Sequence, residues 1–205
     1  QVRVVEEAPN ISAAKLLPDG TWVRLPDARV AGMGVGSECF IADVDGGAGI
    51  KVSGEWTSFP YMLSGTRAAV AGVLSTVNGS RAVSQADVMP WSVDAPSSAV
   101  GMSNRSVGGV DYAYNPGPPV SGQMGGVSGY GPNNVGKQVT VWGRVTSSSR
   151  GVFTIDDGTL PGGLTVSCRV QAARPGVGTF VRVTGIATPH GVDVYANGDI
   201  QRIGE

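Results

Sequence analysis

Few side chains in this sequence have the types and spacing that catalysis requires. His190 is the only histidine among 205 residues, and it stands in a Pro189-His190-Gly191 turn. One chain therefore cannot build an imidazole-based triad or a multi-histidine metal site. No Gly-x-Ser-x-Gly sequence marks an activated serine, and no carboxylate pair stands out for glycoside hydrolysis. We predict a protein that is not an enzyme and that uses no cofactor.

Two acidic turns contain residue types that a calcium site uses. Asp43 and Asp45 precede Gly46-Gly47, and Asp156 and Asp157 precede Gly158. Clustered carboxylates beside a glycine turn suit a hard cation, but the twelve-residue calcium loop is missing. Asp and Gly are also favoured in tight turns for backbone reasons. We interpret both segments as turns, with calcium binding as the alternative and no metal site predicted.

The two cysteines, Cys39 and Cys168, have no metal-ligand spacing. In an oxidising compartment, a disulfide between them would close a loop of about 130 residues and stabilise the fold by roughly 4–5 kcal/mol. Two separate buried thiols are the alternative. Asn-x-Ser triplets at Asn10, Asn78 and Asn104 leave glycosylation open.

Composition limits the class of protein further. Glycine and proline contribute 32 and 13 residues, while hydrophobic residues still make up 41%, which favours short strands and turns around a core. The formal charge of −1 creates no field that would recruit nucleic acid or an anionic membrane. No apolar stretch approaches the ~20 residues of a membrane-spanning helix. The chain begins at Gln1 without an apolar leader, as a processed protein would, so we expect a secreted or surface-exposed protein.

The two ends of the chain resemble each other at an offset of about 112–116 residues. The matching segments are 19–30 with 135–145, 39–43 with 152–156, 49–53 with 163–167, and 65–72 with 178–185. Each copy contains five short segments of alternating apolar and polar residues separated by Gly, Asp, Asn and Ser turns, a pattern typical of strands. We infer a tandem duplication of a small closed barrel, which leaves few exposed strand edges. Gly72 and Gly185 fall at matching mid-strand places, where glycine often marks a barrel corner.

The chain resembles the OB-fold barrels, specifically the tandem modules of secreted bacterial proteins. The resemblance rests on Phe40-Ile41-Ala42-Asp43 before Gly49-Ile50-Lys51-Val52, on Phe153-Thr154-Ile155-Asp156 before Gly163-Leu164-Thr165-Val166, and on the closing segments 181–185 and 199–200. It implies an all-β fold of two tandem five-stranded OB-like barrels with an ordered spacer and an extra N-terminal strand. The expected boundaries are 1–11 for the strand, 12–92 and 133–205 for the barrels, and 93–132 for the spacer.

OB barrels that bind single-stranded nucleic acid place aromatic side chains on their second and third strands, beside a basic groove. Here Phe40 and Phe153 occupy equivalent places next to acidic turns. We therefore expect both rings to fill the two cores, and nucleic-acid binding is the weaker alternative function.

The N-terminal residues Val2, Val4 and Val5 belong to a segment that alternates like a lone strand. Such a strand must pair with its own barrel or with the sheet edge of a neighbouring subunit. The second arrangement is head-to-tail and generates filaments when it does not close into a ring. We predict an extracellular structural protein, a filament or surface-layer subunit, whose partner is another copy of itself.

An accessory module that binds carbohydrate or another surface polymer is the alternative. The aromatic residues that would form its platform are Trp56, Trp91, Tyr112, Tyr114 and Tyr130. Three of these, Tyr112, Tyr114 and Tyr130, lie in the Gly/Ser/Pro-rich spacer, which we expect to pack against the barrels.

Overall fold

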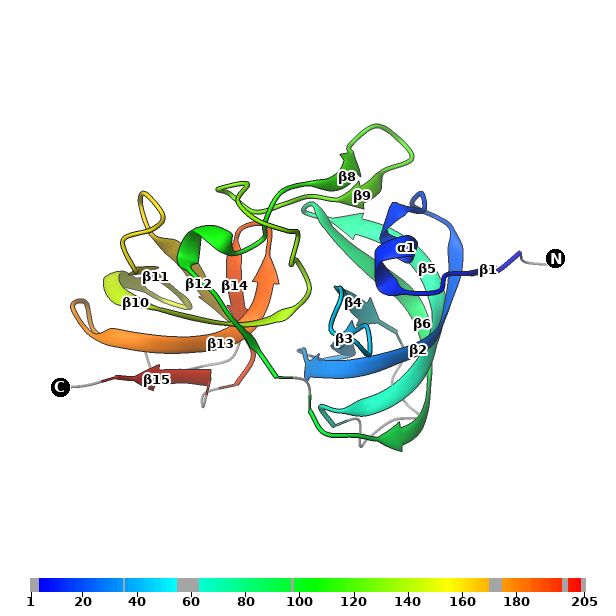
Figure 1. The fold of residues 1–205 in the computed structure, drawn as a ribbon, viewed down its shortest axis with the longest axis horizontal. Helices are drawn as coiled ribbons and strands as arrows, with labels where there is room; N and C mark the ends of the chain where they lie inside the picture. The colour runs from blue at the N-terminus through cyan, green and yellow to red at the C-terminus, as the bar shows by residue number, and fades with distance from the viewer. Residues whose placement is uncertain are drawn as a thin grey trace. The chain divides into compact units, whose positions relative to one another are not determined.

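The computed structural model describes residues 4–34, 36–54, 63–96, 98–169, 175–196 and 199–203. The chain divides into two compact units. Unit 1 contains Gln1–Ser98 and Asp111–Met124, and unit 2 contains Ala99–Val110 and Gly125–Glu205. The described elements are strands, apart from helix α1 (Ile11–Leu16) and the 3-10 turn η1 (Asn104–Ser106) (Figure 1).

Unit 1 is built around a closed five-stranded barrel. Its strands are β2 (Trp22–Met33), β3 (Glu38–Ala42), β4 (Gly49–Ser53), β5 (Thr66–Val77) and β6 (Ser80–Val93). They follow the order β2-β3-β4-β6-β5, and β5 pairs back onto β2 to close the barrel. The pairing of β4 with β6 is parallel, and the others within the barrel are antiparallel. The core contains Val23, Leu25, Ile41, Ile50, Val70 and Val83.

Unit 2 repeats this arrangement. Its strands are β10 (Gln138–Ser149), β11 (Val152–Asp156), β12 (Leu164–Cys168), β13 (Phe180–Thr188), β14 (Gly191–Val194) and β15 (Ile200–Arg202). The barrel order is β10-β11-β12-β14-β13, β13 pairs back onto β10, and β12 pairs in parallel with β14. The predicted all-β fold of two five-stranded barrels is confirmed. Phe153 lies in the core of the second barrel, as predicted, at 2% exposure. The prediction that Phe40 fills the first core is wrong: the ring is buried, at 5% exposure, but its neighbours on β3, Cys39 and Ile41, are the residues that face the core, because successive side chains of a strand point to opposite faces.

The two matching glycines permit close contact between strands. A Cβ atom at Gly72 would lie 2.7 Å from the Ser84 carbonyl oxygen, and one at Gly185 would lie 2.5 Å from that of Asp193. In the first barrel this contact coincides with a register shift between Ala71 and Val73. Only glycine fits where two backbones approach this closely.

The N-terminal segment is part of the duplicated module. Strand β1 (Glu6–Glu7) runs parallel to β2, and the Ala8 N–H donates to the Arg24 carbonyl at 2.9 Å before α1 begins. In unit 2, β7 (Val100–Gly101) runs parallel to β10, and the Met102 N–H donates to the Thr140 carbonyl at 3.0 Å before η1 begins. The duplication therefore extends further toward the N-terminus of each copy than the sequence similarity does.

The segment predicted as a spacer is shared between the units. Its hairpin, β8 (Tyr112–Asn115) with β9 (Ser121–Gln123), belongs to unit 1, whereas β7 and η1 belong to unit 2. The hairpin is therefore an insertion between η1 and β10 of the second module. Among the described residues, no helix is long and apolar enough to cross a membrane.

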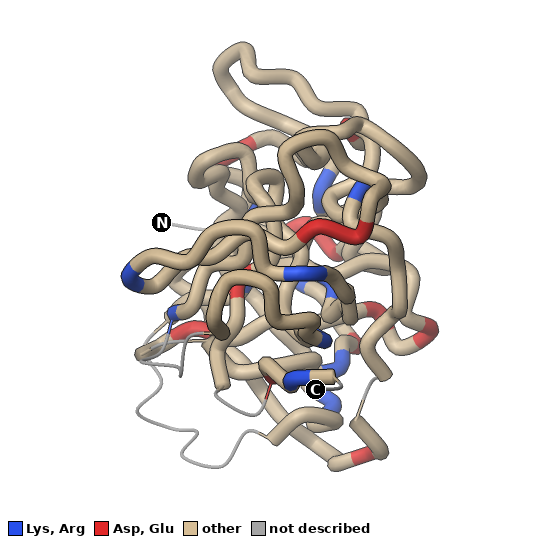
Figure 2. The backbone as a smooth tube through the Cα atoms, turned by 90° about the vertical axis from the view of Figure 1, so that its left-hand side faces the viewer, with Lys and Arg blue, Asp and Glu red and all other residues tan. Residues whose placement is uncertain are grey.

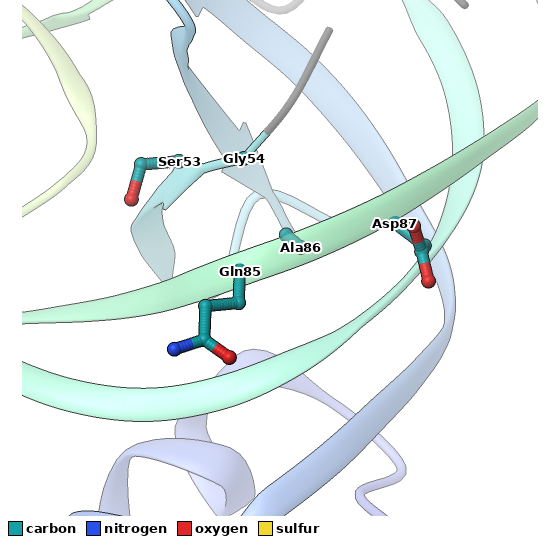
Figure 3. A pocket seen from close by; sticks show the side chains of 5 residues that line it. All are labelled: Ser53, Gly54, Gln85, Ala86 and Asp87. Atoms are coloured by element: carbon teal, nitrogen blue, oxygen red, sulfur yellow. The ribbon is translucent and has the colours of Figure 1, made fainter.

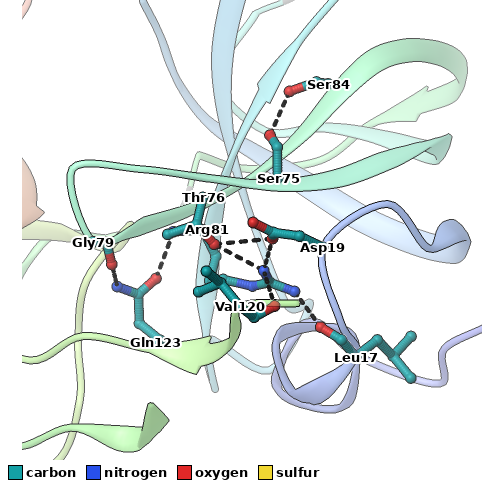
Figure 4. Close-up of polar contacts among 9 residues, drawn as sticks. All are labelled: Leu17, Asp19, Ser75, Thr76, Gly79, Arg81, Ser84, Val120 and Gln123. Atoms are coloured by element: carbon teal, nitrogen blue, oxygen red, sulfur yellow. Dashed lines mark hydrogen bonds and ion pairs between the residues drawn. The ribbon is translucent and has the colours of Figure 1, made fainter. Parts of the chain in front are cut away.

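Two buried side chains attach the hairpin to the first barrel (Figure 4). Gln123 accepts the Arg81 backbone N–H at 3.0 Å and donates to the carbonyls of Gly79 and Met124 at 2.7 and 2.8 Å. The Arg81 guanidinium pairs with Asp19 and donates to the Leu17 carbonyl, at the end of α1. Burial lowers the pKa of Arg81, and the Asp19 carboxylate opposes that effect.

Candidate functional site

Both acidic turns hold backbone segments in place. Asp43 accepts the N–H groups of Ile11 and Ala48 at 2.8 and 3.1 Å, and so fixes the first turn of α1. Asp157 accepts the Asn104 N–H at 2.9 Å at the start of η1, and also the Thr159 N–H and hydroxyl. The two carboxylates thus have the same structural role in the two modules.

The environments of these carboxylates shift their pKa values in opposite directions. Burial raises the pKa of Asp43 more than its two backbone hydrogen bonds lower it. Burial also opposes ionisation of Asp157, but the hydrogen bonds from Thr159 and Asn104 outweigh it and lower the pKa of that carboxyl. Asp45 and Asp156 accept the N–H groups of Gly47 and Gly158, two residues ahead. In the described part of the chain, no group of three His, Cys, Asp or Glu residues is placed to hold a metal ion.

The cysteines are thiols and are not joined in a disulfide, which corrects the disulfide alternative. Cys39 lies on β3 inside the core of the first barrel, fully buried, and burial raises its pKa to about 12. Cys168 is half-buried at the end of β12 in unit 2. A thiol enclosed in one barrel core cannot reach a second barrel without disrupting that core.

His190 lies in the turn between β13 and β14, is exposed, and its backbone N–H donates to the Thr188 hydroxyl at 3.2 Å. A pocket of about 470 Å³ lies beside the end of β4, where Gly54 approaches Ala86 on β6. Figure 3 shows Gln85 and Asp87 leaving β6 in different directions. One amide and one carboxylate that point apart do not make a catalytic arrangement.

The described aromatic residues of the predicted binding platform are divided between the two units. Trp91 is 52% exposed on β6, Tyr112 and Tyr114 are half-buried on β8, and Tyr130 belongs to unit 2. The Tyr130 ring is covered by the Arg105 guanidinium, 3.9 Å from the ring centroid. Trp56 lies outside the described residues. Three of the four described rings therefore belong to unit 1 and one belongs to unit 2.

The described N-terminal valines, Val4 and Val5, lie ahead of β1 and are not part of that strand. Val4 and Val5 are 86% and 47% exposed, and Val2 lies outside the described residues. Glu6 and Glu7 pair with the chain's own β2, and Glu7 forms an ion pair with Arg24 at 2.7 Å.

An aromatic and cationic surface that the sequence analysis missed lies on the outer face of β10 and β13. The antiparallel register places Trp142 opposite Arg182 and Arg144 opposite Phe180, and the Thr140 and Thr184 hydroxyls lie 3.0 Å apart beside them. Trp142 and Phe180 are 37% and 39% exposed. We call this surface the outer face. On the adjacent strand β15, Arg202 lies opposite the inward-facing Val181 and does not belong to this face, but it lines the pocket at one end of it.

One end of the outer face opens into a pocket of about 780 Å³. Arg144 and Arg202 contribute cations to it, and Val177, Phe180 and Ile203 contribute apolar surface. Arg144 donates to the Gly178 carbonyl at 2.7 Å, which fixes one end of its guanidinium. The arrangement offers an anion site next to an apolar surface.

The outer face could have been found from sequence by pairing the first and fourth strands of the barrel. Trp142 and Arg144 alternate with the buried Val141 and Val145, and Phe180 and Arg182 alternate with the buried Val181 and Val183. The alternation alone shows which residues face outward. Only the register shows that aromatic and cationic side chains lie opposite each other.

Comparison with models of known protein families gives no match to this chain, and comparison with curated proteins gives no matching relative. Functional inference therefore rests on the described geometry.

Proposed function

We propose that the protein is a non-enzymatic extracellular structural protein, a filament or surface-layer subunit whose copies associate head-to-tail through their N-terminal segments. The observation that carries the proposal is the exposure of Val4 and Val5 directly ahead of an edge strand. Two adjacent exposed valines ahead of a two-residue strand leave apolar surface and backbone groups available for pairing with another sheet edge.

The hydrogen bonding limits which residues can be exchanged. Glu6 and Glu7 pair with β2, and Ala8 donates to Arg24, so these three residues complete their own barrel. The exchanged segment is therefore confined to the residues before Glu6. A head-to-tail contact of this kind generates an open polymer when the rotation between copies does not close.

The test compares the full chain with a version that lacks residues 1–5, and with the double variant Val4→Ser/Val5→Ser. Sedimentation velocity over a range of concentrations and negative-stain electron microscopy measure assembly. We expect filaments or extended oligomers from the full chain and monomers from both altered versions. The matched control is Val127→Ser, which changes a valine that is 78% exposed in unit 2 and should leave assembly intact.

Two results would contradict the proposal. One is a full chain that sediments as a monomer at every concentration. The other is a shortened chain that assembles as the full chain does.

A binding module is the second candidate function, and the outer face of the second barrel favours it. Exposed aromatic and cationic side chains in direct register provide a recognition surface that does not depend on self-association. Single-stranded nucleic acid is the weaker candidate, because basic and acidic residues are interspersed along the trace in the view of Figure 2 and the formal charge is −1.

A further inference from the structure

We propose that the outer face of β10 and β13 binds a polysaccharide whose sugars carry carboxylates. In this site Trp142 is the stacking platform, Arg144 and Arg182 bind the carboxylates, and Arg202 supplies a further cation in the adjoining pocket. The site goes beyond the proposed assembly role, because it lies on the second barrel and uses none of the N-terminal residues.

Trp142 is held as a platform by a glycine. A Cβ atom at Gly101 would lie 3.0 Å from Cη2 of the indole, so the ring packs directly against the backbone of β7. With one side supported in this way, the ring still leaves 37% of its surface open. A rigid, half-open indole suits the flat C–H face of a sugar, because it offers a large apolar contact at little cost in side-chain entropy.

In the part of the chain that the structure describes, the arginines at this surface have no carboxylate partner. Among the described residues, none forms an ion pair with Arg144, Arg182 or Arg202. Asp156 lies opposite Arg144 on β11, but its carboxylate accepts the Gly158 N–H. Guanidinium groups bind carboxylates through two parallel hydrogen bonds, so unpaired arginines at a surface favour a carboxylate ligand.

The first barrel provides an internal comparison, because the same face there is neutralised. Arg29 and Arg67 correspond in the duplication to Arg144 and Phe180. Arg67 pairs with Asp27 and Asp94, and Arg29 lies 3.6 Å from Asp94. In the first barrel, acidic side chains on this face form ion pairs with its arginines. In the described part of the second barrel, the arginines of this face form no ion pair. An external anion is the partner that this difference indicates.

A carboxylated polysaccharide fits the surface better than a nucleic acid or an acidic peptide does. The face places single cations between aromatic and hydroxyl side chains, and Asp156 and Asp157 follow on the adjacent strand and turn. A nucleic-acid groove needs a continuous basic track. An acidic peptide would bind the cations, but its carboxylate side chains would not stack on the rigid, flat indole ring. A polyuronate presents flat apolar faces, hydroxyls and carboxylates together.

The experiment measures binding of an oligogalacturonate to the full chain by isothermal titration calorimetry at low salt. The methyl ester of the same oligomer, which keeps the sugar backbone and lacks the charges, is the matched ligand control. We expect binding of the acid form, at least about tenfold weaker binding of the ester, and weaker binding of the acid form as salt rises, while the uncharged ester changes little. The measurement is repeated without residues 1–5, so that failed binding and failed assembly are told apart.

The variants are Arg182→Gln and Trp142→Ala, each expected to weaken binding at least about tenfold. Arg150→Gln and Trp91→Ala change an exposed arginine and an exposed tryptophan away from the face and should bind normally. Far-UV circular dichroism checks that each variant is folded. Equal binding of the ester, unchanged binding by both face variants, or tighter binding of oligothymidylate or polyglutamate would each overturn the proposal.

Discussion

At the scale of single residues, Asp43 and Asp157 have the same structural role, but their environments shift their pKa values in opposite directions. Asp43 accepts the Ile11 N–H and Asp157 accepts the Asn104 N–H, and each of these donors belongs to a segment that precedes the barrel in sequence. The sequence placed both in turns with calcium as an alternative. Their oxygens instead satisfy donors at the start of α1 and η1, groups that have no partner within the helix itself.

The first prediction concerns Asp157. Because its pKa is lowered from 3.8 in the folded state, the ionised carboxylate stabilises the fold at neutral pH, and this contribution is lost as pH falls through the folded pKa, below about 4. Replacing it by Asn should lower the free energy of unfolding by about 1 kcal/mol at pH 7. The deficit should shrink in acid, as measured by urea unfolding at several pH values.

Asp156→Asn is the matched control, because Asp156 accepts the Gly158 N–H and not the hydrogen bonds from Asn104 and Thr159 that lower the pKa of Asp157. A deficit of Asp157→Asn that stays constant from pH 7 to below 3 would contradict the argument.

At the scale of elements, the β8–β9 hairpin depends on one buried cation. The Arg81 side chain is fully buried, pairs with Asp19, and donates to Thr76 at 2.9 Å and to the carbonyl of Leu17. Its backbone N–H is bound by Gln123 of the hairpin. α1, the β5–β6 turn region and the hairpin therefore meet at this residue (Figure 4).

The second prediction is that Arg81→Ala lowers the free energy of unfolding by about 3 kcal/mol or more, because it leaves the Asp19 carboxylate without its cation and the Leu17 carbonyl without the guanidinium donor. Arg24→Ala, which removes an exposed ion pair with Glu7, should cost less than about 1 kcal/mol. Urea unfolding compares the two. Hydrogen exchange should show lost protection in the hairpin for Arg81→Ala, and similar values for the two variants would refute the assignment.

At the scale of the whole molecule, the chain passes between its two units three times, after Ser98, Val110 and Met124. Each unit has its own closed barrel and its own apolar core. Because the cores are separate, we expect a destabilising substitution in one unit to reduce the stability of that unit alone.

The third prediction uses the matched glycines. Gly72→Ala and Gly185→Ala each force a Cβ into a backbone contact under 3 Å, at a cost of about 1–3 kcal/mol. Hydrogen exchange followed by mass spectrometry should show lost protection in unit 1 for the first variant and in unit 2 for the second. Equal loss in both units from either variant would mean that the chain unfolds as one cooperative body.

The barrels could be predicted from sequence because their signals are local. Val139, Val141 and Val145 alternate with outward residues, and turns such as Asn78-Gly79 separate the strands. The extended module could not be predicted. Glu6-Glu7 and Val100-Gly101 share no side-chain chemistry, and their equivalence lies only in backbone pairing with β2 and β10.

By itself, then, the sequence determined the all-β class, the duplication and the core position of Phe153, because strand alternation and turn residues act between near neighbours. Only the tertiary structure decided which charges remain open. Arg67 pairs with Asp27 forty residues away, while Arg182 lies opposite Trp142 and forms no ion pair with any described residue. These partners are set by strand register across a closed barrel, and a shift of one residue would turn every side chain to the other face.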